Sequence, residues 1–256
     1  MVPGMDDTAL LSLAADLARR AASVIMTIRA RGFETETKPD ASPVTEADHA
    51  AEAVILAGLR AATPDIPVVA EEEVAAGHDP EYGPVFWLVD PIDGTREFAA
   101  MREDFTVNIG LVRDGRVVLG VVGLPAHGEM FGGIVGRGAW KRNGAGEKPI
   151  RVRAVPAAGL DVLASRHYAD DPRLGAFLAG RPVASVRNIG SAVKFVRVAE
   201  GVADLYPRLG RTMEWDTAAP QAVLEAAGGH VRTMDGAALL YGKPGWENPH
   251  FLCTGA

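Results

Sequence analysis

The sequence has a single cysteine, Cys253, among its 256 residues. A lone thiol cannot form a disulfide framework within the chain, and it cannot supply a zinc site that is built from several thiolates. Cysteine usage therefore favours a reducing compartment, and we expect a cytoplasmic protein. Cys253 itself is expected to behave as a small, buried hydrophobic residue.

Positive charge and long apolar runs are also scarce. Lysine and arginine number 26 against 33 aspartates and glutamates, which gives a net charge of −7. Binding to nucleic acid needs a basic surface, so we expect no nucleic-acid partner, and an anionic substrate must meet local positive charge or metal ions. The N-terminus, MVPGMDDTALL, lacks the basic region and apolar core of a signal peptide, and we expect no integral membrane segment. The sequence leaves peripheral membrane association open.

Apolar residues are plentiful, at 48% of the chain, which is enough for one large domain or two small ones. Residues 1–155 are predicted to hold a helix pair followed by a run of strands, with a hairpin that turns at Asp114-Gly115. Residues 156–256 alternate between strands and helices. This order predicts an α+β or α/β fold in which helices sandwich two sheets.

The element boundaries follow from periodicity and from capping residues. Thr45 and Asp48 stand in capping-box spacing at the start of the second helix, and Gly32 ends the first. The predicted helices span 6–31, 45–62, 171–178, 191–200 and 215–227. The predicted strands include 66–70, 85–90, 160–165, 182–187 and 203–207.

Four acidic residues fall at the predicted ends of these elements: Glu71, Asp90, Asp93 and Asp216. Taken alone, Asp216 would be a helix N-cap, and Glu71 would belong to a solvated acidic turn that runs to Glu73. Brought together, the four carboxylates would repel one another unless cations lay between them. Ligands that are all oxygen suit hard cations, above all Mg²⁺ when phosphate is also bound.

The stretch VDPIDGTREF continues directly from two of these acids into Gly94 and Thr95. If a helix begins here, its N–H groups and its positive dipole end form an anion site. Glycine permits close backbone approach, and the Thr95 hydroxyl can hold a water or a phosphate oxygen. Two neighbouring cations could then activate water and stabilise the leaving oxygen of a phosphate ester.

Other phosphate motifs do not fit. Aspartate-nucleophile phosphatases use D-x-D-G-T, whereas two residues, Pro91 and Ile92, separate the acids in this sequence. The chain has no G-x-x-x-x-G-K-[ST] loop. The glycines of GIVGRGAW lack dinucleotide-binding spacing and lie among predicted strands, so we interpret them as turns.

The segments WLVDPIDGTREF, AEEE at residues 70–73 and WDTAAPQAVLEAAGG together resemble the signatures of the inositol monophosphatase superfamily, the Mg²⁺-dependent, lithium-sensitive phosphatases. Within it, the sequence is most similar to the bacterial 3'(2'),5'-bisphosphate nucleotidases. The segments that carry this similarity are SPVTEAD, GTREFAAMREDFTVNIGLV, SRHYAD, IGSAVKF, VAEGVADLYPRLG and EWDTAAPQAV. The resemblance implies a layered αβαβα sandwich. It also implies that residues 1–155 carry most metal ligands and that residues 156–256 carry Asp216 and the nucleotide-binding residues.

The resemblance further implies two to three Mg²⁺ ions and a set of ligands. One metal would be held by Glu71, Asp90 and the carbonyl of Ile92, and a second by Asp90, Asp93 and Asp216. A third, weaker ion would touch Glu71, with Asp48 nearby through water. Glu71 and Thr95 would orient and deprotonate the attacking water, and Asp48 would share that role.

Nucleotide contacts are implied in the same way for His167, Ser191, Lys194 and Arg208. The implied substrate site also includes Glu71, Ile92, Asp93, Gly94, Thr95 and Asp216. Lys194 and Arg208 suit a second phosphate, because ammonium and guanidinium groups bind phosphate. Without the resemblance, Lys194 would be interpreted as a solvated helix residue, Arg208 as an ordinary turn residue and His167 as an ordinary surface histidine. No role is assigned to Glu73.

These implications favour hydrolysis of the 3'-phosphate of adenosine 3',5'-bisphosphate to AMP and phosphate, in sulfur metabolism. The phosphosulfate form of the nucleotide is a second candidate substrate. An inositol or sugar monophosphatase is the alternative within the superfamily. A non-enzymatic metal- or nucleotide-binding regulator is disfavoured, because all four acids are present. The sequence leaves open whether the protein is a monomer or a homodimer.

Overall fold

The structure, a computed structural model, describes residues 5–38, 43–78, 80–168 and 171–255. Ser42 of the segment SPVTEAD, and Ala169 and Asp170 of SRHYAD, lie outside the described residues. The helices are α1 (Asp7–Arg31), α2 (Glu46–Ala62), α3 (Glu71–Ala75), α4 (Thr95–Ala99), α5 (Pro172–Leu178), α6 (Val193–Ala199) and α7 (Glu214–Ala226), with short 3₁₀ turns η1 (Pro125–His127), η2 (Arg166–Tyr168) and η3 (Pro244–Trp246).

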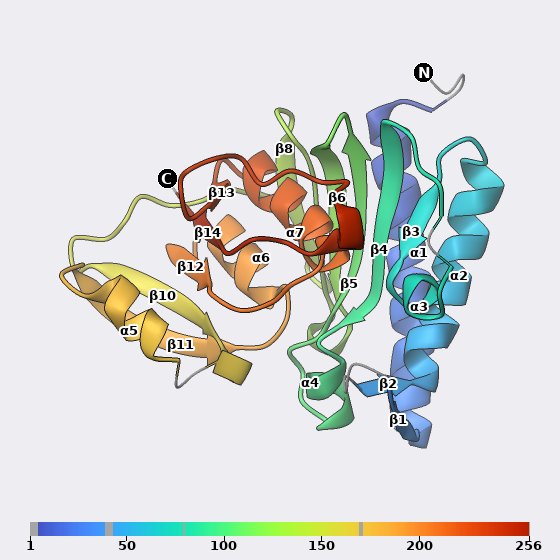
Figure 1. Ribbon diagram of the computed structural model, residues 1–256, viewed down its shortest axis with the longest axis horizontal. Coiled ribbons are helices and arrows are strands. Elements are labelled where there is room, and N and C mark those ends of the chain that lie inside the picture. The colour runs from blue at the N-terminus through green and yellow to red at the C-terminus, as the bar shows by residue number, and fades with distance from the viewer. Residues whose placement is uncertain (1–4, 39–42, 79, 169–170, 256) are drawn as a thin grey trace.

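The two long N-terminal helices lie side by side on the outer face of a large sheet (Figure 1). Asp6 caps α1, since its Oδ1 accepts a hydrogen bond from the Ala9 N–H at 2.8 Å. Thr45 and Asp48 form the capping box that the sequence predicts for α2. The apolar faces of both helices are buried against the sheet, so the helix pair forms the first layer of the molecule.

The large sheet has seven strands in the order β3-β4-β5-β6-β7-β8-β9. Its strands are β3 (Val68–Ala70), β4 (Val85–Asp93), β5 (Thr106–Arg113), β6 (Arg116–Leu124), β7 (Glu129–Ile134), β8 (Gly138–Asn143) and β9 (Gly146–Ile150). Only the pair β3 and β4 is parallel within this sheet; the other pairings are antiparallel. The predicted hairpin at Asp114-Gly115 is confirmed, since these residues join β5 to β6.

The second sheet has five strands in the order β11-β10-β12-β14-β13. These are β10 (Leu160–Ser165), β11 (Val183–Ile189), β12 (Leu205–Arg208), β13 (His230–Thr233) and β14 (Phe251–Thr254). Cys253 lies on β14, between two neighbouring strands, and is fully buried as predicted. A separate two-stranded ribbon, β1 (Thr35–Thr37) and β2 (Pro43–Thr45), precedes α2.

Helices α6 and α7 lie between the two sheets (Figure 1). Two glycines on the large sheet let α7 approach closely: a Cβ at Gly110 would lie 2.7 Å from the Ala219 nitrogen, and one at Gly120 would lie 2.6 Å from the Ala219 Cα. With the helix pair on one side and α5 beyond β10 and β11 on the other, the layers alternate between helix and sheet. The expected αβαβα sandwich is confirmed.

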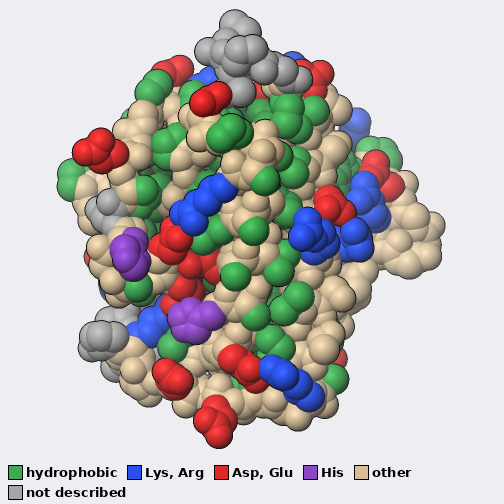
Figure 2. Space-filling view, turned by 90° about the vertical axis from the view of Figure 1, so that its right-hand side faces the viewer, with side chains coloured by type: hydrophobic (Ala, Val, Ile, Leu, Met, Phe, Trp, Pro, Cys, Tyr) green, Lys and Arg blue, Asp and Glu red, His purple; other side chains and the backbone are tan. Residues whose placement is uncertain are grey.

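The side of the molecule that carries the helix pair is shown in Figure 2. Hydrophobic side chains are interspersed with charged ones on this face, and acidic side chains gather near the middle of the view, beside basic and histidine side chains. Within the described ranges, no helix combines the length and the apolar character that crossing a membrane requires.

Candidate functional site

Three of the four predicted acids converge at one edge of the large sheet. Glu71 is the first residue of α3, directly after β3, and Asp90 lies on the neighbouring parallel strand β4. Asp216 is the third residue of α7, whose N-terminus points at the same edge. One carboxylate oxygen of each acid lies within 4.8 Å of the other two. Residues separated by 145 positions in the sequence therefore form one acidic cluster.

Asp90 lies deepest in this cluster. Its side chain is 1% exposed, and neither carboxylate oxygen has a hydrogen-bond partner among the described residues. Burial, followed by the charges of Glu71, Asp93 and Asp216, raises its pKa well above the ordinary range. Burial, followed by the charges of Asp93 and Glu71, raises the pKa of Asp216 to about 7. An unpartnered, buried carboxylate among other acids is the environment that a divalent cation would stabilise.

Asp93 and Ile92 lie beside the cluster but have partners of their own. Asp93 Oδ2 accepts a hydrogen bond from the Ala192 N–H at 2.5 Å, and the Ile92 carbonyl oxygen lies 3.0 Å from Thr95 Oγ1. Burial raises the pKa of Asp93, although the charge of Lys194 opposes this shift. The sequence placed the end of the strand at Asp90, and this was wrong. The strand β4 continues to Asp93, which still pairs with Thr106 after a register shift.

Thr95 begins α4 and is linked to Asp48. Its hydroxyl lies 3.0 Å from Asp48 Oδ1, while Asp48 Oδ2 accepts hydrogen bonds from the N–H and the hydroxyl of Thr45. Burial raises the pKa of Asp48. Gly94 has a φ of 94°, a left-handed conformation that favours glycine. Because α4 has only five residues, its dipole is short, and the threonine hydroxyl is the clearer polar feature of this turn.

Two interpretations made from the sequence need correction. Asp216 is not the N-cap of α7: the cap is Met213, whose N–H donates to Asp216 Oδ2 at 2.8 Å, and Asp216 occupies the third helical position. The three glutamates after β3 do not form one solvated turn. Glu73, which had no assigned role, forms an ion pair with Arg60 at 2.7 Å, because successive helical residues point in different directions.

A cavity of about 950 Å³ opens over the acidic cluster, between the two halves of the chain. Nine of the predicted site residues line it. They are Glu71, Asp93, Gly94, Thr95, His167, Ser191, Lys194, Arg208 and Asp216. The remaining three, Asp48, Asp90 and Ile92, do not line the cavity and are each 1% exposed. The structure therefore brings all the predicted residues to one cavity and its floor.

Lys194 is not a solvated helix residue, so that alternative was wrong. It is 1% exposed, and its Nζ donates to the carbonyls of Ile189 at 3.0 Å and Ser191 at 2.5 Å. The ammonium also lies 5.0 Å from the centre of the Tyr206 ring. Burial, together with the charge of Arg208, lowers the pKa of Lys194 to about 7. The lysine therefore holds the backbone around Ser191, where φ is 45°.

The other two predicted nucleotide contacts come from a strand and from a 3₁₀ turn. Arg208, at the end of β12, donates from Nε to the Gly210 carbonyl at 3.1 Å. His167 lies on η2, with Nε2 2.8 Å from Nη1 of Arg96. Partial burial and then the charges of Arg96 and Arg208 lower the pKa of His167. Two arginines, Arg96 and Arg208, therefore bring positive charge to the cavity lining.

Sequence reasoning missed several charged residues of the cavity. Lys38 Nζ lies 2.8 Å from Glu71 Oε1 and 2.6 Å from Glu72 Oε1. Burial alone would lower its pKa, but the two glutamates outweigh this and raise it. Arg96 could have been found, since it follows Thr95 directly in the quoted motif. Lys38 could not have been found from the sequence, because it contacts Glu71 and Glu72 only through the folding of the β1–β2 ribbon against α3.

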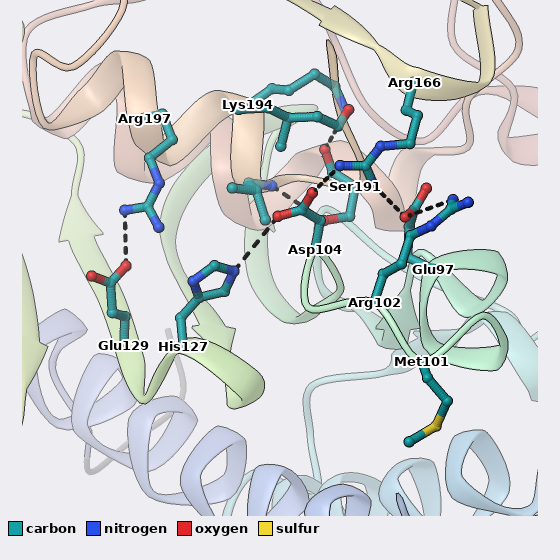
Figure 3. A network of polar contacts seen from close by, with 12 residues as sticks. Glu97, Met101, Arg102, Asp104, His127, Glu129, Arg166, Ser191, Lys194 and Arg197 are labelled. Atoms are coloured by element: carbon teal, nitrogen blue, oxygen red, sulfur yellow. Dashed lines mark hydrogen bonds and ion pairs between the residues drawn. The ribbon is translucent and has the colours of Figure 1, made fainter. Parts of the chain in front are cut away.

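Arg166 was also missed. Figure 3 shows it between Glu97 and Asp104, and Arg166 also lines the cavity. This arginine precedes His167 on η2, whereas the two acids belong to α4 and to the loop before β5. Its ion pairs therefore join the two halves of the chain.

A fold of alternating layers, with an acidic cluster at the edge of the large sheet, defines the class of protein. Residues 6–251 match the inositol monophosphatase family, and the chain belongs to this family. The resemblance recognised in the sequence is therefore confirmed.

More specific similarities come from individual relatives. The chain is 44% identical over 249 residues to the 3'(2'),5'-bisphosphate nucleotidase CysQ of Salmonella typhimurium, covering 96% of this chain and 99% of the relative. It is 42% identical over 246 residues to CysQ of Escherichia coli K12, covering 94% and 98%. The crystal structure of CysQ from Bacteroides thetaiotaomicron is similar with a TM-score of 0.81, at 32% identity over 98% of this chain and 99% of that one. An inositol monophosphatase from Anabaena gives a TM-score of 0.76, at 28% identity over 96% and 90%.

Proposed function

We propose that this protein is a Mg²⁺-dependent phosphatase that hydrolyses the 3'-phosphate of adenosine 3',5'-bisphosphate to AMP and phosphate. The observation that carries the proposal is the convergence of Glu71, Asp90 and Asp216 at a cavity that Arg96 and Arg208 also line. Relatives at 42–44% identity over nearly the full chain are named 3'(2'),5'-bisphosphate nucleotidases, which supports the same substrate. The phosphosulfate form of the nucleotide has the same 3'-phosphate and is a second candidate.

The residues present fit Mg²⁺, because their donors are carboxylate and carbonyl oxygens and because Asp90 is buried without a partner in the described structure. Glu71, Asp90 and the Ile92 carbonyl would hold one ion. Asp90, Asp93 and Asp216 would hold a second, and a third would contact Glu71. When bound, Mg²⁺ would lower the pKa of water and stabilise negative charge on the phosphate oxygens.

Thr95 and Asp48 would handle the proton of the attacking water. The Thr95 hydroxyl donates toward Asp48 Oδ1, which leaves its lone pairs able to accept from a water molecule. As water loses its proton to Thr95 Oγ1, the threonine proton would pass to Asp48 Oδ1. Burial raises the pKa of Asp48, which makes its carboxylate a better proton acceptor. Glu71, on the other side of the cavity floor, would orient the same water.

The second phosphate would be recognised by the basic wall. Arg208, Arg96 and His167 line it, and Lys194 adds positive charge from beneath the Ser191 backbone. The two guanidinium groups carry fixed positive charge, and the His167 ring, neutral because its pKa is lowered, can still donate a hydrogen bond. Such a wall suits an anion better than a neutral polyol. This feature favours a bisphosphate nucleotide over an inositol or sugar monophosphate.

We further infer that residues 1–155 and 156–256 act as two units that meet at this cavity. The first would supply most metal ligands, and the second would supply Asp216 and the nucleotide contacts. We also propose that the enzyme acts in the cytoplasm on a small-molecule substrate and that it contributes to sulfur metabolism.

The test is phosphate release from adenosine 3',5'-bisphosphate and from inositol 1-phosphate, measured with purified protein in Mg²⁺ and in EDTA. We expect faster, Mg²⁺-dependent turnover of the bisphosphate. Asp65→Asn, an exposed change in the turn after α2, serves as a control that should leave both rates unchanged. Faster turnover of inositol 1-phosphate would contradict the proposed substrate.

A further inference from the structure

We propose that Arg166 is a positioning residue that sets the shape of the substrate cavity by bridging Glu97 and Asp104. We call these three residues the Arg166 clamp. The inference deepens the proposed function, because it concerns the same cavity. Its physical basis is that the clamp joins three separate chain segments, two of which carry a predicted substrate residue: Thr95 on α4 and His167 on η2.

The contacts of the clamp are direct. Arg166 Nη2 lies 2.5 Å from Asp104 Oδ2, and Nη1 forms an ion pair with Glu97 Oε2 (Figure 3). Glu97 is 8% exposed and lies two residues after Thr95 on α4. The two nitrogens of one planar group therefore fix α4 and the following loop at the same time.

Backbone packing makes this junction sensitive to small shifts. A Cβ at Gly190 would lie 2.7 Å from Glu97 Cγ and 2.8 Å from the Asp104 carbonyl oxygen. A Cβ at Gly94 would lie 3.1 Å from that same oxygen and 3.1 Å from Ser191 Cβ. The turns before Thr95 and at Ser191 thus both pack against the Asp104 carbonyl and against each other. A movement of Asp104 or Glu97 would displace both turns.

The clamp also positions His167. This residue follows Arg166 on η2, and its Nε2 lies 2.8 Å from Arg96 Nη1 on α4. Adjacent residues of η2 therefore contact α4 at two points, one through Glu97 and one through Arg96. Releasing the first contact would let η2 move away from α4 and would widen the cavity.

The remaining partners of the two acids are weaker. Glu97 Oε2 has Arg102 at 3.3 Å, and Asp104 Oδ1 has the His127 ring nitrogen at 3.6 Å. Without Arg166, two largely buried carboxylates would face each other with little compensation, which favours separation of the segments that carry them. Lysine could not replace the arginine fully, since a single ammonium lacks the fork that reaches both acids.

The experiment compares Arg166→Gln and Arg166→Lys with a matched control, Arg153→Gln. Arg153 also bridges two acids, Asp161 at 2.6 Å and Asp204 at 2.8 Å, and both arginine side chains are 33% exposed. Arg153 does not line the cavity. We expect Arg166→Gln to raise the KM for adenosine 3',5'-bisphosphate about tenfold, with kcat changed much less. Arg166→Lys should restore part of the affinity. An effect of this size is reasonable, because a 1 Å misplacement of reacting groups can lower the reaction rate roughly a hundredfold. Arg153→Gln should lower the melting temperature to a similar extent and leave KM unchanged.

A second measurement does not depend on the substrate. The His167 ring, assigned by comparison with His167→Gln, is titrated by NMR in each variant. In the parent protein, burial and then the charges of Arg96 and Arg208 keep its pKa below the ordinary value. We expect the pKa of His167 to rise in Arg166→Gln and also in Arg166→Lys, which keeps the positive charge next to the ring, as η2 moves away from α4. It should stay unchanged in Arg153→Gln.

The outcomes separate the two proposals. If Arg166→Gln alters only the melting temperature, as Arg153→Gln does, Arg166 is merely structural and the clamp is refuted. If the parent protein does not hydrolyse the bisphosphate, the proposed function fails, and the His167 titration still decides the clamp. Should Arg166→Gln fail to fold, Arg166→Lys and Glu97→Gln carry the same test.

Discussion

Asp90 illustrates how a single residue can be arranged for a ligand at a cost to the fold. A buried carboxylate is destabilising unless it is paired, yet both oxygens of Asp90 lack a protein partner in the described part of the chain. The charges of Glu71 and Asp216 add to the penalty of burial. Such an arrangement is stable only when a cation balances it or when protons are retained.

The first prediction concerns Asp90→Asn. The substitution keeps the shape of the side chain but removes one metal-ligating charge, so we expect activity to fall by at least about 100-fold, the scale of losing one preorganised electrostatic group. In EDTA the variant should melt at a higher temperature than the parent, because repulsion with Glu71 and Asp216 is relieved. Activity assays and thermal unfolding in EDTA check the two effects. A lower melting temperature in EDTA would contradict the electrostatic account.

Among individual site residues, those within motifs could be predicted and those made by distant contacts could not. The acids and Thr95 could be predicted from WLVDPIDGTREF and its companion segments, because within each segment the functional residues are close together in the sequence. Lys38 and Arg166 have no such signal. Each acts through carboxylates that lie dozens of positions away in the sequence, so their roles depend on tertiary packing.

At the level of elements, α7 determines whether the site forms. It carries Asp216 at its N-terminus and packs closely on β5 and β6, where Gly110 and Gly120 leave room for the Ala219 backbone. The position of Asp216 relative to Asp90 therefore depends on two glycines, Gly110 and Gly120, that do not line the cavity.

The second prediction follows from this packing. In Gly120→Ala, the added methyl would lie 2.6 Å from the Ala219 Cα, so α7 must shift outward. We expect a loss of about 1–3 kcal/mol in the free energy of unfolding, which is typical of overpacking, and a weaker affinity for Mg²⁺ as Asp216 moves. Chemical denaturation and a Mg²⁺ titration of activity measure the two changes.

The same strand offers the control for this experiment. A Cβ at Gly123 would meet Val107 Cβ at 3.7 Å, an ordinary van der Waals contact. Gly123→Ala should therefore leave the Mg²⁺ dependence intact. Equal effects of the two substitutions would mean that glycine flexibility, rather than the approach of α7, is responsible.

The long elements could be predicted from sequence, whereas several of the short ones could not. The periodicity and caps of α1 and α2 place both helices to within one residue of the observed bounds. By contrast, β1, β2 and β9 were not predicted, and α3 was interpreted as a turn. A segment of three to five residues is too short to show a helical or strand periodicity. Its conformation is fixed instead by the sheet or cavity around it.

For the molecule as a whole, the acidic cluster links stability to pH. In the metal-free protein the pKa of Asp216 is about 7, against an ordinary value of 3.8, and burial likewise raises the pKa of Glu52 to about 7. Between the ordinary pKa of each carboxyl and its raised value of about 7, the folded state therefore binds more protons than the unfolded state. Stability falls as pH rises through this window, by about 1.4 kcal/mol per pH unit for each such carboxyl.

The third prediction is the resulting pH profile. In EDTA, the melting temperature should fall between pH 5 and pH 7, and saturating Mg²⁺ should flatten the fall, because bound cations favour the ionised acids. Lys194, whose pKa is lowered to about 7, acts with the opposite sign, but only above that pH. Asp216→Asn provides the control, since it should flatten the EDTA profile without metal. A profile in EDTA that rises from pH 5 to 7 would contradict the prediction.

Cys253 lies on β14, between β12 and β13 of the five-stranded sheet, with no exposed surface, and burial raises the pKa of its thiol well above the ordinary range. A coloured thiol reagent added to the native enzyme can reach this sulfur only after the sheet around it has opened. The rate at which Cys253 is labelled therefore measures how often the five-stranded sheet opens. The native cysteine makes this measurement possible without introducing a cysteine by mutation.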